Sequence, residues 1–539
     1  MEVRNICFIG AGRVGGCTAT VIASKNPKIA VFVVDKDKSR IEAWNTDEVP
    51  ITEPGLLELV QKCRKRRRPN LFFSHNIAIS ICKADIVFIT VNTPSKPSGS
   101  EKFSDTLDMS SIESVAKLIA NHSHTSKIVV IKSTVVPGTC ENVAKILEEH
   151  AICKSSFCVL SNPEFLAAGT ALRNLLSPDR IVIGSRQDQL DSEAATSLEA
   201  LFRSWVNAKK IVHMKTSSAE IAKLASNALL AQRVSSINAL SLLCEFEDAS
   251  VQEVSLACGM DRRIGSYMLD ASLGFGGPCL SKDLSALVNQ YQNRCLEPIA
   301  DYWNAIFDVS KRRMSEACDR VIAFSGPPGS PCKGRKIAIL GAAFKKDTDQ
   351  VFNSPILGVI TELLIHDIQV SVYDPRVTAT QMREQLEPNI EPTDFRRLTP
   401  LLEVCKTANQ ACLGAHGVVV VTDWDEFRRT TDVVSTDRID AKGRENGKVS
   451  GCGWNMCFRS WLRSYTRSGC FQERFAQKAA CSAQDLDWVQ IACSLKPPKY
   501  VFDGRGIVDK QKLESLGLKV DVIGSYDWFE QDRRSGCKI

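Results

Sequence analysis

The segment from 274 to 283, GFGGPCLSKD, carries a cysteine with the surroundings of a nucleophile. Glycines lead into Pro278, a residue suited to the first helical position, and Cys279 follows it. If a helix begins there, Lys282 and Asp283 lie three and four residues on, so a cation and an acid–base group share the face of the thiol. Cysteine is also commonly a buried apolar residue, so this segment alone leaves both interpretations open.

A second segment has the spacing of a phosphate cradle. Gly10, Gly12 and Gly15 form GxGxxG directly after an apolar run, where a tight turn lets a pyrophosphate approach helix N–H groups. Asp35 follows Gly15 by 20 residues and suits ribose hydroxyls while repelling a 2′-phosphate, which favours NAD over NADP. Three basic residues beside it could tolerate that phosphate: Lys36, Lys38 and Arg40.

Alternating elements must position these groups. Residues 5–10 predict a strand, a helix follows to about Lys25, and 29–35 predict the next strand. Further apolar runs of strand length, each ending near Gly, Pro, Asn or Thr, occur at 86–91, 128–131 and 158–160. This alternation predicts a doubly wound α/β domain with a parallel sheet.

The middle of the chain has a different pattern. Residues 217–245 contain neither Gly nor Pro, and their apolar residues recur at helical spacing, which predicts one long helix. A Gly/Pro-rich linker then precedes a second strand–helix–strand pattern near Lys336. We therefore expect an α/β protein with two Rossmann-like doubly wound domains, 1–212 and 333–539, joined by a central long-helix domain, 213–325.

An atypical segment interrupts the last domain at about 430–485. It is rich in Ser, Gly, Arg and Cys, and its four cysteines lack metal-site spacing. We expect an inserted, poorly ordered loop, with a retained intron or gene-model artefact as the alternative. The 21 cysteines of the whole chain show no CxxC pair and no disulfide framework, so reduced thiols and no metal site are expected.

Length, charge and hydropathy exclude several protein classes. The 539 residues are 44% hydrophobic and 24% charged, which suits packed domains rather than disorder. The net charge of +6 is too weak to predict a nucleic-acid partner, and no apolar run approaches the ~18 residues of a membrane span. We expect a soluble, cytoplasmic protein with no membrane partner.

Ten ordered segments together indicate a family. They are GAGRVGG at 10–16, PITEPGL at 50–56, VNTP at 91–94, KSTVVPGT at 132–139, SNPEFLAAGTA at 161–171, KLASNALLAQRVSSIN at 223–238, GMDRRIG at 259–265, GFGGPCLSKD at 274–283, AILGAAFKKDT at 338–348 and FDGR at 502–505. The chain resembles the UDP-glucose/GDP-mannose dehydrogenase family from end to end, excepting the atypical segment.

The resemblance implies a reaction. This is the NAD-dependent four-electron oxidation of UDP-glucose to UDP-glucuronate through a cysteine thiohemiacetal and thioester, with one water consumed. The alternatives are a dehydrogenase of another nucleotide sugar, such as GDP-mannose or a UDP-N-acetyl-hexosamine, and a non-catalytic scaffold that binds UDP-sugar or NAD.

The resemblance also implies catalytic roles for six residues: Cys279 as nucleophile, Lys223 as the cation for developing oxyanion charge, Asn227 beside it, Asp283 with Thr134 to orient water, and Glu164 as acid–base group. Lys223 and Asn227 are one helical turn apart and so share a face. Taken without the resemblance, that pair is more commonly a solvated helix face.

Ligand contacts follow by the same resemblance. The expected cofactor residues are Gly10, Ala11, Gly12, Arg13, Val14, Gly15, Asp35, Arg40, Val91, Asn92, Thr93, Ser133, Thr134 and Lys282. The expected substrate residues are Glu164, Phe165, Leu166, Lys223, Asn227, Arg263, Phe275, Gly276, Phe344, Lys345 and Arg505. An arginine like Arg263 comes from the neighbouring subunit in the family, which implies a homo-oligomer, a dimer or dimer-based hexamer, with the helix at 217–245 as dimer core.

The chain departs from the family pattern at four positions. Ala168 stands where a cofactor-contacting Glu is usual, and Phe352 stands where an arginine is usual. Arg13 replaces an aromatic residue and Pro278 replaces a small one. Ala168 and Phe352 motivate the alternative of a non-catalytic scaffold. The presence of Cys279, Lys223 and Asp283 argues against that alternative.

Overall fold

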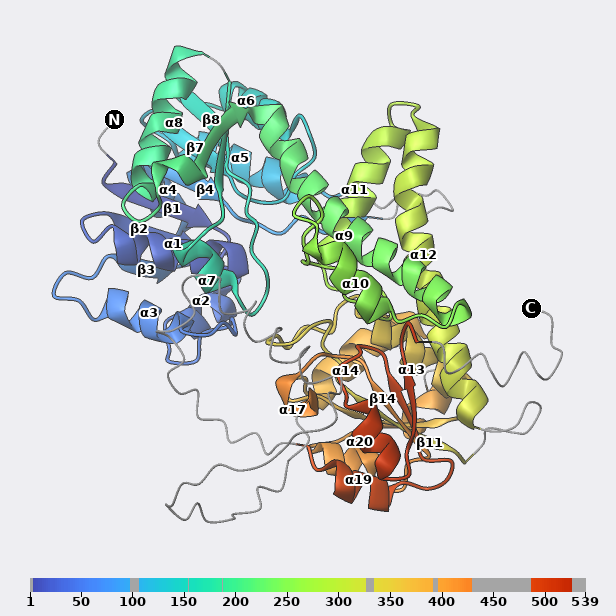
Figure 1. The fold of residues 1–539 in the computed structure, drawn as a ribbon. Helices are drawn as coiled ribbons and strands as arrows, with labels where there is room; N and C mark the ends of the chain where they lie inside the picture. The colour runs from blue at the N-terminus through green and yellow to red at the C-terminus, as the bar shows by residue number, and fades with distance from the viewer. Residues whose placement is uncertain are drawn as a thin grey trace, which may run out of the picture.

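The structure, a computed structural model, describes residues 3–96, 106–153, 155–186, 188–325, 334–390, 396–428 and 486–525. Two α/β units lie at opposite ends of the molecule with a helical segment between them (Figure 1). The atypical segment expected at 430–485 lies outside the described residues.

An eight-stranded sheet forms the first unit, in the order β10-β9-β8-β7-β4-β1-β2-β3. Its strands are β1 (Asn5–Ile9), β2 (Ala30–Val34), β3 (Leu71–Ser74), β4 (Ile86–Ile89), β7 (Lys127–Ile131), β8 (Phe157–Ser161), β9 (Ile181–Ser185) and β10 (Ile211–Lys215). All neighbours pair in parallel except β8 and β9. The strand order reverses between β1 and β4, which places a ligand crevice at the carboxyl ends of these two strands.

Helices cover both faces of this sheet, and each face has its own apolar core. They are α1 (Arg13–Lys25), α2 (Lys38–Trp44), α3 (Leu56–Arg64), α4 (Ile77–Lys83), α5 (Ser110–His122), α6 (Thr139–Glu149), α7 (Ala171–Leu176) and α8 (Gln189–Phe202). The short pieces are β5 (Ser95–Lys96), β6 (Thr106–Leu107) and η1 (Ala208–Lys210). Burial on both faces explains why the central strands are continuous apolar runs.

The second unit contains a six-stranded parallel sheet in the order β13-β12-β11-β14-β15-β16. Its strands are β11 (Lys336–Leu340), β12 (Gln369–Tyr373), β13 (Leu402–Val404), β14 (Gly417–Val420), β15 (Tyr500–Asp503) and β16 (Lys519–Val522). The helical pieces are α13 (Pro355–Ile365), α14 (Ala379–Leu386), η2 (Glu387–Asn389), η3 (Thr399–Leu401), α16 (Ala408–Cys412), α17 (Asp425–Arg428), α19 (Trp488–Ser494) and α20 (Lys510–Ser515). Numbered within the unit, this order is 3-2-1-4-5-6, the Rossmann arrangement.

The two units repeat one local device. In the first, the Asp35 carboxylate at the end of β2 accepts the N–H of Ala11, which follows β1, at 2.8 Å. In the second, Asp374 after β12 accepts the N–H of Ala342 after β11, also at 2.8 Å. The expected fold class, two Rossmann-like units around a helical middle, is confirmed.

The helical middle contains α9 (Thr216–Phe246), α10 (Val251–Met260), α11 (Leu280–Gln292) and α12 (Glu297–Ser325). The helix expected at 217–245 is α9. One face of α9 packs on α11 and α12, and further apolar residues of α9 are exposed: Ile221, Leu229, Leu230, Leu240, Leu243 and Phe246.

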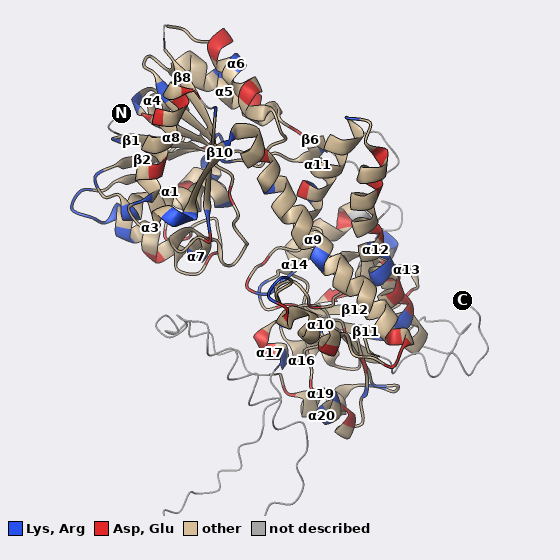
Figure 2. Cartoon of the chain, turned by 45° about the horizontal axis from the view of Figure 1, so that its top comes forward, with Lys and Arg blue, Asp and Glu red and all other residues tan. Residues whose placement is uncertain are grey.

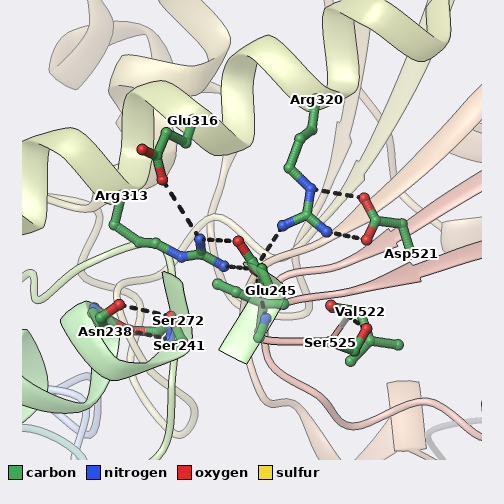
Figure 3. Close-up of polar contacts among 12 residues, drawn as sticks. Asn238, Ser241, Glu245, Ser272, Arg313, Glu316, Arg320, Asp521, Val522 and Ser525 are labelled. Carbon is green, nitrogen blue, oxygen red and sulfur yellow. Dashed lines mark hydrogen bonds and ion pairs between the residues drawn. The ribbon is translucent and has the colours of Figure 1, made fainter. Parts of the chain in front are cut away.

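A buried ionic cluster joins this middle to the second unit (Figure 3). The Glu245 carboxylate of α9 accepts hydrogen bonds from Arg313 at 2.9 Å and from Arg320 at 2.7 Å. Arg320 also donates to Asp521 of β16 at 2.9 Å, and the Tyr500 hydroxyl donates to the same carboxylate at 2.7 Å. All five side chains are buried, so these charges neutralise one another across the junction.

Acidic and basic residues are interspersed over both units in Figure 2, rather than gathered by sign on one of them. Among the described helices, none combines the length and the apolar character that a membrane crossing requires.

Candidate active site

The helix α9 brings two polar side chains to the carboxyl ends of the first sheet. The Lys223 ammonium donates to Oε1 of Glu164, which follows β8, at 2.9 Å, and it lies 3.8 Å from Oδ2 of Asp283. One turn on, Asn227 Nδ2 donates to the same Oδ2 at 2.6 Å. The i, i+4 spacing therefore presents a cation and an amide to one pair of carboxylates.

Asp283 has one committed oxygen and one free oxygen. Its side chain is buried, and its Oδ1 has no hydrogen-bond partner among the described residues. Burial raises the pKa of Asp283 above its ordinary value, and the charges of Lys223 and Lys282 only partly offset this. A buried carboxyl oxygen without a partner can accept a bond from water or from a reacting group.

Cys279 stands at the N-cap of α11. The N–H of Asp283 donates to the Cys279 carbonyl at 3.0 Å, so the thiol and this carboxyl share the first helical turn. Cys279 is exposed by accessible surface, but the surrounding protein still desolvates its sulfur. That desolvation and the Glu164 charge raise the pKa of the thiol, and Lys223 acts in the opposite direction. The thiol, rather than the thiolate, is thus the resting form.

Glu164 is the carboxyl of this pair whose charged form the surroundings favour. Its Oε2 accepts the N–H of Leu166 at 2.6 Å while its Oε1 accepts from Lys223. Burial works against the charge, but Lys223 and the Leu166 N–H lower the pKa of Glu164 below its ordinary value. The two buried carboxyls therefore have pKa values displaced in opposite directions, an arrangement typical of acid–base sites.

Side chains from neighbouring loops join the edge of the site. The Thr93 hydroxyl donates to the Thr134 carbonyl at 2.8 Å, and Lys282 Nζ lies 3.4 Å from the Thr93 carbonyl oxygen. The Ser133 hydroxyl donates to the Val91 carbonyl at 2.7 Å. The expected residues after β4 and β7 thus contact one another and α11, whereas Asn92 is exposed.

The glycine-rich turn fits a pyrophosphate. Gly10 has φ +112°, and a Cβ there would lie 2.5 Å from the Thr90 carbonyl oxygen; a Cβ on Gly15 would lie 1.9 Å from the Gly10 carbonyl oxygen. A Cβ on Gly12 would meet nothing within 4 Å, so open space adjoins this backbone. Gly12 is also the N-cap of α1, which has no side-chain cap and no acidic residue in its first turn. The N–H groups that start α1, including that of Val14, suit an anionic ligand.

Asp35 is fixed toward that turn. Besides the N–H of Ala11, its carboxylate accepts the N–H of Asp37 at 3.0 Å and a bond from Arg40 at 3.2 Å. Arg40 is thereby placed beside the acid expected to face the cofactor ribose. These contacts hold the acidic end of β2 in a defined orientation next to the cradle.

Arg13 is engaged in an ion pair. Its Nε lies 3.1 Å from Oε1 of Glu53, whose side chain is fully buried. Glu53 also accepts the N–H groups of Gly169 and Ala171, each at 2.9 Å. Arg13 and Glu53 therefore hold the loop that contains Ala168.

Two cations of the second unit lie in the electrostatic field of one carboxylate, that of Asp423. Arg505 lies 3.4 Å from Asp423, and the half-buried Lys345 has Glu53, Asp347 and Asp423 around it. Burial lowers the pKa of Lys345 despite these acids. The charge of Asp423 therefore acts on both cations, and that of Glu53, from the first unit, also acts on Lys345.

The glycine loop before Cys279 is wedged against this second unit. A Cβ on Gly276 would lie 2.8 Å from the Asn353 carbonyl oxygen, and one on Gly277 would lie 2.6 Å from the Phe344 ring. Phe275 packs on Phe307 of α12 with ring centroids 5.7 Å apart. Only glycine permits this approach of the loop to the second unit.

Arg263 and Phe352 stand apart from this set. The Arg263 side chain is 89% exposed and pairs with Asp261 at 2.6 Å. Phe352 is also exposed.

Two cations beside the site were not among the expected residues. Lys132 is buried and donates to Asn162, two residues before Glu164. The Arg180 guanidinium lies 3.7 Å from the centroid of the Phe165 ring. Lys132 belongs to the KSTVVPGT segment, but burial of a lysine cannot be read from such a motif because lysine is usually solvated.

Comparison with known proteins accords with this geometry. Three models of the UDP-glucose/GDP-mannose dehydrogenase family match the chain: the NAD binding domain over 4–206, the central domain over 217–312 and the UDP binding domain over 338–445. UDP-glucose 6-dehydrogenase 5 of Oryza sativa subsp. japonica is 38% identical over 532 residues, which are 96% of each chain.

Two further relatives extend the comparison. UDP-glucose 6-dehydrogenase of Pongo abelii is 37% identical over 526 residues, 97% of this chain and 93% of the relative. The solved structure of a UDP-glucose dehydrogenase from Pyrobaculum islandicum superposes with a TM-score of 0.68 at 29% identity, covering 80% of this chain and 93% of that one. The chain belongs to the UDP-glucose/GDP-mannose dehydrogenase family.

Proposed function

We propose that this protein is an NAD-dependent UDP-glucose 6-dehydrogenase. The observation that carries the proposal is Cys279 at the start of α11, beside one buried ammonium, two buried carboxyls and a half-buried amide. Overall, one UDP-glucose, two NAD⁺ and one water give UDP-glucuronate, two NADH and three protons.

The ammonium of Lys223 supports both oxidations. Bound NAD⁺ supplies the hydride acceptor. As the C6 alcohol loses hydride and proton, negative charge develops on its oxygen, and a buried ammonium aimed at that oxygen stabilises it. Cys279 then adds to the aldehyde carbon, and its S–H proton passes to a base. Asp283 suits this task, because its raised pKa makes its carboxylate a stronger proton acceptor.

Hydrolysis of the thioester calls for a base that is ionised at neutral pH. Glu164 has a lowered pKa and lies against Lys223, so it can take a proton from the attacking water. Asp283 with Thr134 orients that water. Covalent capture by Cys279 prevents loss of the aldehyde, and the thiohemiacetal can donate the second hydride.

The remaining residues hold the ligands. Lys345 and Arg505 bind the diphosphate, the loop at Phe275 and Gly276 encloses the sugar, and Arg263 reaches the site of a neighbouring subunit. The high exposure of Arg263 supports that assignment. The exposed apolar residues of α9 support a homo-oligomer, a dimer or dimer-based hexamer, with α9 at its core. The domains are 1–212 for NAD, 213–325 for assembly and 333–539 for UDP-sugar, in a cytoplasmic enzyme.

One assay tests the function. NADH formation is measured with UDP-glucose, GDP-mannose and UDP-N-acetyl-hexosamines, and NADH is counted against acid formed. We expect two NADH per UDP-glucose consumed and little with the other sugars. Turnover only of another sugar would assign a different dehydrogenase, and UDP-sugar binding without any turnover would assign a scaffold.

A further inference from the structure

Lys132 is a buried cation that the mechanism above does not use. It directly follows β7, and only 3% of the residue is exposed. Its Nζ donates to Oδ1 of Asn162 at 3.0 Å and to the Asn162 carbonyl oxygen at 3.3 Å. An ammonium is expensive to bury, so its place between two neutral oxygens calls for a reason.

Asn162 is held from three directions. Its N–H donates to the Ile131 carbonyl of β7 at 2.8 Å, and its Nδ2 donates to the Val182 carbonyl of β9 at 2.7 Å. Lys132 supplies the third set of bonds. Asn162 leads through one proline to Glu164, so this arrangement fixes the backbone from which the Glu164 carboxylate reaches Lys223.

Four titratable groups surround the Glu164 carboxylate. Lys223 of α9 and Lys132 act on Glu164 as cations, whereas Cys279 and Asp283 approach from α11. Burial and the neighbouring Lys223 lower the pKa of Lys132 to about 8, and Glu164 opposes this. In return, the charge of Lys132 is one of the causes that keep the pKa of Glu164 low.

We propose that Lys132 is a positioning residue for thioester hydrolysis, holding the segment from Asn162 to Glu164 so that the Glu164 carboxylate stays between Lys223 and the acylated Cys279. The inference rests on the proposed function. In that step the water oxygen bonds to the acyl carbon, a water proton passes to Glu164, the C–S bond breaks, and sulfur leaves with its electron pair and is then protonated. Both hydride transfers precede this step.

The test compares substitutions of two buried lysines at the two ends of β7: Lys127 begins the strand and Lys132 follows it. Lys132→Met removes the proposed positioning charge. Lys127→Met is the matched control, because Lys127 is also buried but donates to the carbonyls of Cys82 and Ala84, away from the site. Rapid mixing with UDP-glucose and excess NAD⁺ follows NADH, and intact mass after acid quench follows the acyl adduct on Cys279.

For Lys132→Met we expect a burst approaching two NADH per site, more adduct than in wild type, and steady-state turnover reduced at least about tenfold. Loss of a neighbouring cation raises the pKa of Glu164, so the acidic limb of the rate–pH profile moves up by about one unit. Lys127→Met keeps the wild-type profile and adduct level. If Lys132→Met does not fold, Lys132→Gln removes the charge while keeping a donor, and the same outcomes are expected.

An unchanged pH profile and no extra adduct in the folded Lys132 variant would overturn the inference, as would the same changes in Lys127→Met. These outcomes leave the proposed function intact, because it is judged on wild-type NADH formation. If wild type forms no NADH from UDP-glucose, the function fails and the inference fails with it.

Discussion

Asn227 donates to Oδ2 of Asp283 at 2.6 Å, and the other oxygen of Asp283 is left without a partner among the described residues. The amide therefore selects which carboxyl oxygen faces the chemistry. Lys223 lies 3.8 Å from the same Oδ2, so the committed oxygen carries both contacts and Oδ1 remains for a proton or a water.

Asp283→Asn tests this relationship. The amide keeps the shape of the side chain but cannot take a proton, so kcat for acid formation should fall about 100-fold or more. Calorimetric binding of UDP-glucose should stay near wild type. Asp308→Asn, at an exposed position on α12, serves as the control. A loss of binding that equals the loss of turnover would contradict a catalytic role for Asp283.

The titration of Cys279 gives a second prediction. Its pKa lies above the ordinary value of 9.0, so the rate of alkylation by iodoacetamide should rise with pH through a midpoint above 9. Glu164→Gln removes a negative neighbour and should lower that midpoint; Lys223→Met removes a positive neighbour and should raise it. Peptide mass spectrometry reports modification at Cys279, with the exposed Cys493 as internal control. A wild-type midpoint below 9 would contradict the assignment.

Cys279→Ser tests covalent catalysis. A serine ester hydrolyses far more slowly than a thioester, so this variant should form no measurable acid. Chromatography of the reaction products measures acid formation, and a melting temperature equal to that of wild type shows that the variant is folded. Acid formation at the wild-type rate would exclude the covalent route.

Two glycines of the phosphate cradle offer a matched pair. Gly12→Ala places a methyl group in open space, so the chain should fold normally while the methyl obstructs the pyrophosphate and weakens NAD binding at least about tenfold. Gly15→Ala drives a methyl group into the Gly10 carbonyl and should lower the melting temperature. Thermal melting and NAD titration separate the two effects. Normal NAD affinity in Gly12→Ala would place the cofactor elsewhere.

Periodicity was sufficient for the fold because the central strands are apolar runs that end at turn residues and α9 is a long, uninterrupted helical pattern. The strands β3, β9 and β10, each four or five residues long, were not separately predicted, because periodicity alone does not distinguish such short apolar runs from pieces of a buried helix. The topology around β1 follows from the alternation of elements, whereas the antiparallel contact of β8 with β9 is a tertiary feature.

The contacts within the site could not be predicted from local sequence patterns alone. Spacing alone places Asn227 on the face of Lys223 and Asp283 on the face of Cys279, but the contact between the two pairs depends on packing of α9 against α11. A helix start ordinarily favours a thiolate, yet burial and, after it, the charges of Glu164 and Asp283 raise the pKa of Cys279. Burial of Lys132 likewise arises only when three strand ends meet.

The cluster around Glu245 gives the last prediction, which concerns stability. Glu245→Gln leaves the buried guanidinium groups of Arg313 and Arg320 without a full countercharge, so the free energy of unfolding should fall by about 3–5 kcal/mol. Burial opposes ionisation, but the two arginines hold the pKa of Glu245 below its ordinary 4.5. A carboxyl whose pKa is lower in the folded than in the unfolded protein stabilises the fold at any pH above its unfolded-state pKa. The difference in free energy of unfolding between wild type and variant should therefore be largest at pH 7 and shrink as the pH falls below about 4.

Glu316→Gln is the control for this prediction, because Glu316 lies at the exposed edge of the same cluster, 3.8 Å from Arg313 (Figure 3). A partly exposed pair contributes about 0–1 kcal/mol, so this variant should unfold nearly as wild type does. Denaturant unfolding at several pH values measures both variants. Equal losses would mean that the charge of Glu245 does not hold the second unit to the helical middle. A large loss for Glu245→Gln alone, fading in acid, would locate that attachment in the carboxylate shared by Arg313 and Arg320.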